Sequence, residues 1–239
     1  IWRSAHDELI MQSLDTSVIE NIKIVNAKYF HEKSGSTIEL TYNIYGNGIL
    51  KIKQTLYPSG VEYPELPRFG MKVSINETFD NLEWFGRGPH ESYWDRKTSA
   101  KIDRYKGKVI DQTYKYVRPQ ETGNKTDIRW LALYNGSIGL MVKGLPVFDG
   151  SVHNYDYALL DYYKGSQRHG KIDIIKGNQI DLIIDYKQMG VGGDNSWGAK
   201  PHFKYTLPMD TTVYNLEYAI IPFNKKNELD SLSRINIDN

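Results

Sequence analysis

Three short polar side chains and one large aromatic ring stand together in residues 185–198, which read DYKQMGVGGDNSWG. They are Asp194, Asn195, Ser196 and Trp197. Such a group suits a sugar, since an aromatic ring can cover an apolar C–H face while polar groups bond the hydroxyls. A Gly-rich turn whose Trp197 plugs a sheet edge is the structural alternative. Asp194 could also bind a hard cation with nearby carbonyls, or cap a turn. We predict that the four residues bind substrate.

Two further stretches concentrate groups that form strong hydrogen bonds. Residues 86–97 read GRGPHESYWDRK, and residues 116–130 read YVRPQETGNKTDIRW. Arginine–carboxylate pairs of this kind either hold loops in place or contact a ligand, and both interpretations stay open. The candidates for a cleft or a loop-fixing role are Arg87, Glu91, Asp95, Arg96, Glu121 and Asn124.

The chain offers no complete catalytic set in any one stretch. A retaining glycosidase needs two carboxylates roughly 5 Å apart. Glu91, Asp95 and Glu121 could supply them, but they lie in two separate loops. The six histidines are scattered without zinc-ligand spacing, and no Ser–His–Asp arrangement stands out. We therefore assign no catalytic residue and no metal ligand.

Composition narrows the class of protein. The chain has 239 residues, 40% hydrophobic and 25% charged, with a net charge of +1. We expect neither nucleic acid nor a membrane as a partner, because the charge is small and no apolar run could span a bilayer. Cysteine is absent, which excludes disulfides and leaves the compartment open between cytoplasm and bacterial periplasm. The 18 Tyr and 5 Trp fit carbohydrate contact, and also fit strand propensity alone.

Alternating apolar residues predict about a dozen short strands and an all-β, large antiparallel sandwich. Residues 37–45 and 49–57 form a hairpin around Asn47 and Gly48, a strong turn signal. Residues 128–134 and 138–142 form another around Asn135-Gly136.

Some elements depart from this repeated hairpin pattern. Residues 153–168 carry apolar side chains at helical spacing and predict one short helix. Residues 202–207 alternate and predict a late strand. We expect a sandwich domain over residues 1–222 and a polar, mobile C-terminal tail over residues 223–239.

In chain order, residues 86–97, 116–130 and 185–198 form the first, second and third motifs. Taken together in this order, they resemble the C-terminal domain of family 2 β-galactosidases, also called the small-chain or fifth domain. The sequences LPRFG (residues 66–70) and WRSAHDE (residues 2–8) fit the same pattern. The opening departs from the usual Trp-Arg-Ala-Pro-Thr-Asp-Asn-Asp, which leaves the roles of Asp7 and Glu8 open. The resemblance covers the chain to about Pro222.

The resemblance implies a galactose-mutarotase-like supersandwich from an enzyme that hydrolyses terminal β-D-galactosides with retention. In that family the catalytic glutamates lie in a (β/α)₈ barrel, and this chain has no repeated strand–helix alternation. The fragment alone is therefore expected to be inactive. In relatives the Trp of the DSW sequence stacks on the sugar, and Trp197 matches that position. Expected partners are a galactoside, the catalytic barrel domain and further copies of the enzyme. Parent enzymes often use Mg and Na in other domains, and no cofactor is implied here.

Three other functions stay open. A free-standing carbohydrate-binding module would use the same Trp197 surface without a barrel. A mutarotase-like epimerase needs a carboxylate base and a histidine acid facing each other across the sheet, and that histidine pattern is not recognisable. A purely structural domain would only support the barrel or the oligomer.

Overall fold

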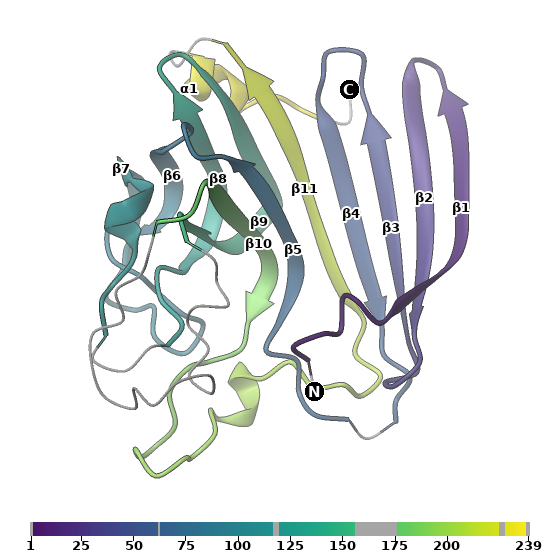
Figure 1. Cartoon of the computed structure of the whole chain (residues 1–239), viewed down its shortest axis with the longest axis vertical. Helices are drawn as coiled ribbons and strands as arrows, with labels where there is room; N and C mark the ends of the chain where they lie inside the picture. The colour runs from purple at the N-terminus through teal and green to yellow at the C-terminus, as the bar shows by residue number, and fades with distance from the viewer. Residues whose placement is uncertain (1, 62, 117–119, 156–175, 225–227, 238–239) are drawn as a thin grey trace.

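The computed structural model describes residues 2–61, 63–116, 120–155, 176–224 and 228–237. Within them, eleven strands join in one branched sheet in which every pairing is antiparallel (Figure 1). The predicted all-β antiparallel class is confirmed. The strands are β1 (Leu9–Ile19), β2 (Ile22–His31), β3 (Ser36–Ile44), β4 (Leu50–Tyr57), β5 (Arg68–Asn76), β6 (Asn81–Gly88), β7 (Lys101–Lys108), β8 (Lys125–Asn135), β9 (Ile138–His153), β10 (Gln179–Gln188) and β11 (Tyr214–Phe223).

Two packed layers make the sandwich. The main path runs β1-β2-β3-β4-β11-β9-β8-β6-β7, and β10 leaves it by pairing with the far part of β9 and with β5. Side chains of β11 and β5 touch although the two strands do not pair. The Tyr218 hydroxyl lies 3.1 Å from the Met71 sulfur, and the Tyr214 and Phe69 rings are 6.4 Å apart. A single apolar core between the layers, including Leu131 of β8, therefore holds β5 and β10 over the main sheet.

The opposite face of the main sheet carries a second apolar cluster. Trp130 and Ala132 of β8 point to it, while Leu131 of the same strand points to the first core, so this strand is buried on both faces. Leu229, in the short helix α1 (Leu229–Leu232), and Ile237 are buried against this cluster. The described part of the expected polar tail is thus anchored to the sheet, because its few apolar side chains lie under β8 and β11.

The turns of two hairpins agree with the sequence prediction. The hairpins β3–β4 and β8–β9 form as predicted, with Gly48 and Gly136 at positive φ in their turns. The strand predicted over residues 202–207 is wrong. Residues Phe203–Tyr205 form a 3-10 turn, and the Thr206 N–H donates to the Phe203 carbonyl instead of a neighbouring strand.

The predicted helix over residues 153–168 lies outside the described residues except at its start. There His153 is the last residue of β9, and Asn154 follows in a bend. Within the part of the chain that the structure describes, no helix has the length and apolar character needed to cross a membrane.

Candidate functional site

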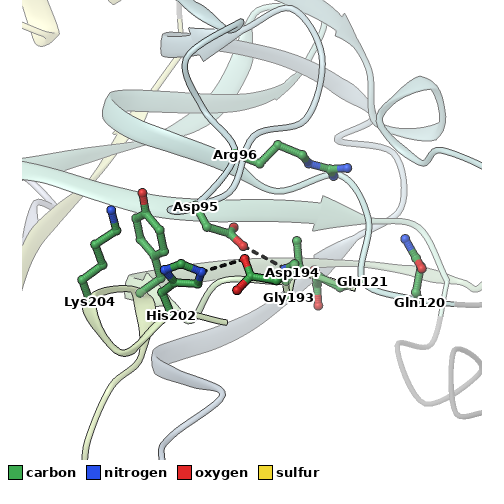
Figure 2. A pocket seen from close by; sticks show the side chains of 11 residues that line it. Asp95, Arg96, Gln120, Glu121, Gly193, Asp194, His202 and Lys204 are labelled. Carbon is green, nitrogen blue, oxygen red and sulfur yellow. Dashed lines mark hydrogen bonds and ion pairs between the residues drawn. The ribbon is translucent and has the colours of Figure 1, made fainter. Parts of the chain in front are cut away.

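The three motifs, far apart in sequence, meet around one cavity of about 720 Å³ (Figure 2). The first motif brings Asp95 and Arg96, and the second brings Glu121. The loop after β10 supplies another wall, and in Figure 1 this loop extends below the sheets. The described residues that line the cavity are Asp95, Arg96, Gln120, Glu121, Val191, Gly192, Gly193, Asp194, His202, Lys204 and Tyr205.

Asp95 holds the loop after β10 against the first motif. Its Oδ2 accepts a hydrogen bond from the Gly192 N–H at 2.8 Å. Gly190 approaches so closely that an added Cβ would lie 2.8 Å from the Asp95 carboxyl carbon. The Gly190 N–H also donates to the Tyr205 carbonyl at 2.8 Å. Close approach to Asp95 therefore favours glycine at position 190.

Glu91 joins the first motif to the second. It accepts hydrogen bonds from the Tyr116 hydroxyl, from the Gly123 N–H at 2.8 Å, from Thr122 at 3.1 Å and from Arg96 at 2.8 Å. Burial opposes ionisation of Glu91, but these hydrogen bonds outweigh it and hold its pKa below the usual value. Glu91 is thus an ionised clamp between two loops.

Arg87 and Asn124 also make contacts that fix loops. The Arg87 guanidinium bonds Asp127 at 2.5 Å and the carbonyl of Ala100 at 2.7 Å. The fully buried Asn124 amide donates to the Ser92 carbonyl at 2.8 Å, and the Ser92 N–H donates back to the Asn124 carbonyl. Neither Arg87 nor Asn124 lines the cavity.

Trp197 projects from the loop with 92% of its surface exposed, and it is not among the lining residues. Its backbone N–H donates to Asn195 Oδ1 at 2.8 Å, which closes a local turn in the loop. Asp194 lines the cavity and contacts His202 Nε2 at 2.7 Å. Ser196 is exposed beside them. Of the four residues predicted to bind substrate, the structure therefore places Asp194 at the cavity and the ring outside it.

A network of buried charges lies behind Glu121 and was not singled out from the sequence. Arg68 contacts Glu121 and Asp185, each at 3.4 Å, and donates to Gln188 at 2.7 Å. Burial raises the pKa of Glu121, although the nearby Arg68 opposes this. Arg68 falls in the LPRFG sequence, but a single arginine at the start of a strand gives no signal of its partners. His202 and Tyr205 were missed because their segment was predicted to be a strand.

Because Asp149 and Asp185 are buried acids, we expect the free energy of unfolding of the chain to depend on pH. Burial raises the pKa of each to about 7, whereas an unfolded Asp titrates near 4. Below pH 4 both states are protonated; from about pH 4 to 7 only the unfolded chain loses its protons, so the free energy of unfolding falls as pH rises. Asp149→Asn keeps the acceptor for the Asp127 N–H, which lies at 3.1 Å.

Asparagine at position 149 does not titrate, so Asp149→Asn lacks this loss. We therefore expect the free energy of unfolding of Asp149→Asn, relative to that of wild type, to rise by roughly 2 kcal/mol from pH 5 to pH 8. Urea denaturation at both pH values measures this, with the exposed Asp111→Asn as control. An equal difference between Asp149→Asn and wild type at the two pH values would contradict the expectation.

The backbone around Gly193 leaves no room for a side chain in the loop that carries Trp197. A Cβ added there would lie 2.0 Å from the Ala199 carbonyl oxygen, a backbone atom that cannot move alone. We expect Gly193→Ala to displace the loop and to increase its cleavage by a protease at least tenfold, roughly the effect of 1.4 kcal/mol on local opening. Gly46→Ala is the matched control, because a Cβ there meets nothing within 4 Å. Equal cleavage of both variants would show that the loop tolerates a side chain.

The described residues contain no group of three or more His, Cys, Asp or Glu able to hold a metal ion.

Comparison with known proteins gives a family match over most of the chain. The family model described as "Beta galactosidase small chain" matches residues 1–220, which confirms the resemblance carried by the three motifs. A β-galactosidase of Priestia megaterium is 40% identical over 215 residues, covering 90% of this chain and 20% of that protein. One from Vibrio cholerae is 30% identical over 214 residues, with the same two shares. The chain thus spans about a fifth of the length of these curated relatives.

Solved structures with a similar trace are much more distant in sequence. The GH36 α-galactosidase AgaA of Geobacillus stearothermophilus is 11% identical with a TM-score of 0.48, covering 91% of this chain and 28% of that one. A galactose 1-epimerase of Lactobacillus acidophilus is 8% identical with a TM-score of 0.47, covering 89% of this chain and 66% of the other.

Proposed function

Because the chain belongs to the β-galactosidase small-chain family, we propose that it is the C-terminal domain of an enzyme that hydrolyses terminal β-D-galactosides with retention. The observation that supports this most is the family match over residues 1–220, which takes in all three motifs. The catalytic carboxylates and the barrel that holds them belong to the remainder of that enzyme. The chain alone is expected to be inactive.

Within that enzyme, Trp197 forms one wall of the sugar site and excludes water from it. A tryptophan is seldom left 92% exposed, because its large ring gains from burial. The ring sits on a loop that Asp95 and the Asn195 turn hold in place, so it is presented to a facing surface without a large loss of entropy. We propose that the facing surface is the barrel domain and that the galactoside lies between them.

We also propose that the enzyme is a homo-oligomer. The edge strand β1 leaves Leu14, Val18 and Ile19 more than half exposed. An unpaired apolar edge of this kind is usually covered in the working protein. Light scattering of the full-length enzyme tests this, and a monomer at micromolar concentration would contradict it.

The test of the function is the specificity of the full-length polypeptide that contains this chain. We expect hydrolysis of a nitrophenyl β-D-galactoside but not of its α-anomer, and proton NMR should detect β-galactose as the first product. Activity on the α-anomer alone, or α-galactose as the first product, would contradict the proposal.

A further inference from the structure

The cavity needs an explanation of its own, separate from the exposed ring of Trp197. Four stretches of this chain make its walls, at residues 95–96, 120–121, 191–194 and 202–205, and Trp197 is not among the described lining residues. Its volume of about 720 Å³ lies within the range of small-molecule sites, roughly 300–1,000 Å³. The cavity is thus large enough for one sugar ring or two.

The charges around the cavity nearly balance. The lining carboxylates are those of Asp95, Glu121 and Asp194, and the lining basic side chains are those of Arg96, His202 and Lys204. Figure 2 shows Lys204 and His202 toward one end and Glu121 and Gln120 toward the other, with Asp95 between them. A site for a strong anion or cation would carry an excess of one sign. A lining that holds both donors and acceptors suits a neutral ligand that offers both.

Two lining carboxylates each commit one oxygen to the fold and leave the other unsatisfied. Asp95 Oδ2 accepts from the Gly192 N–H, and Glu121 Oε2 faces Arg68 at 3.4 Å. Asp95 Oδ1 and Glu121 Oε1 are buried, and no described residue donates a hydrogen bond to them. These two oxygens lie below the cavity surface, out of reach of a ligand. Ligand hydroxyl groups would instead bond Asp95 Oδ2 and Glu121 Oε2, because a carboxylate oxygen has two lone pairs and can accept more than one hydrogen bond.

An aromatic ring completes the set. Tyr205 lines the cavity, and Trp94 holds its ring edge-on with the centroids 5.9 Å apart. The Lys204 ammonium lies 4.8 Å from the Tyr205 ring centroid. A fixed ring beside convergent polar groups matches the apolar face and the hydroxyl rim of a sugar.

We propose that this cavity is a second carbohydrate-binding site, which holds a neutral sugar by its hydroxyl groups through Asp95, Glu121 and Tyr205. It goes beyond the proposed function and does not depend on it, because all of its walls come from this chain. The chain alone should therefore bind a mono- or disaccharide with a Kd of about 1–20 mM, the range for a ligand of this size.

The experiment titrates galactose, lactose and glucuronate into the 239-residue chain and follows the chemical shifts of the protein by NMR. Asp95→Asn and Glu121→Gln are nearly isosteric and turn one acceptor into a donor. Each should raise the Kd roughly fivefold or more, the effect of one lost hydrogen bond to a charged group. Matched controls are the exposed Asp111→Asn and Glu20→Gln, which should change the Kd less than about twofold.

Circular dichroism establishes that each variant is folded. Gln120→Ala gives an independent test if Asp95→Asn is not, because the Gln120 side chain is exposed at the cavity wall and should still weaken binding. Absence of saturable binding by wild type, or tighter binding of glucuronate than of lactose, would overturn the proposal. Binding abolished by Trp197→Ala and unchanged in the cavity variants would also overturn it, while leaving the proposed wall of the galactoside site intact.

Discussion

Trp197→Ala in the full-length enzyme is expected to lower kcat/KM for a β-galactoside by roughly 5- to 150-fold. On the proposed function, the change removes an aromatic wall worth about 1–3 kcal/mol from the sugar site. Because the ring is 92% exposed in this chain, its removal should leave the free energy of unfolding of the domain nearly unchanged. Steady-state kinetics together with urea denaturation separate the two effects.

Phe203→Ala is the matched control for this change. Phe203 is also a strongly exposed aromatic residue, at 73%, and it stands in the 3-10 turn after the same loop. We expect kinetics within about twofold of wild type for Phe203→Ala. Trp197→Phe should lose less activity than Trp197→Ala, since a smaller ring remains. Unchanged kcat and KM in Trp197→Ala would refute a role for the ring in substrate binding.

Arg68→Met is expected to destabilise the chain by about 3–5 kcal/mol, the largest effect we predict on folding. The arginine is the cation that faces both Glu121 and Asp185, and the Asp185 side chain is only 1% exposed. Methionine fills a similar volume but leaves both carboxylates without that charge. Such a loss exceeds the net value of the ion pairs, because it includes the cost of unpaired buried charge.

The pH dependence identifies the mechanism. Without Arg68 the buried acids stay protonated to higher pH, so the destabilisation should shrink as pH falls from 8 to 5. Lys108→Met is the control, because that side chain is 49% exposed and pairs with Asp80, which is 48% exposed. Thermal or urea unfolding at the two pH values measures both variants. A loss in Arg68→Met that is small and independent of pH would show that solvent reaches the network.

The sequence predicted those parts of the fold that are decided locally. The β3–β4 hairpin follows from alternating apolar residues on either side of Asn47 and Gly48. Strands β1 and β7 were not predicted from the sequence. Apolar and polar residues alternate along a strand only when one of its faces is buried, and most side chains of these two strands are exposed. The segment after Trp197 alternates by chance, and its backbone bonds close a 3-10 turn instead.

The candidate site was predictable as a set of motifs, but its geometry was not. Asp95 and Glu121 reach one cavity only because β10 brings the following loop back across the first two motifs, a long-range pairing that no local pattern encodes. Arg68 is coupled to Asp185 and Gln188 by the same pairing of β5 with β10. Carbohydrate binding by these residue types stays a prediction, while tertiary packing decides which of the side chains share a wall.

The measurement that tests the account most directly is a crystal structure of the full-length enzyme with a bound galactoside analogue. We predict that the Trp197 ring lies against the C–H face of the sugar, within about 4 Å, with the barrel's carboxylates on the opposite side. A ring that faces solvent, or that packs on another part of the enzyme away from the sugar, would contradict the claim that this chain completes the site.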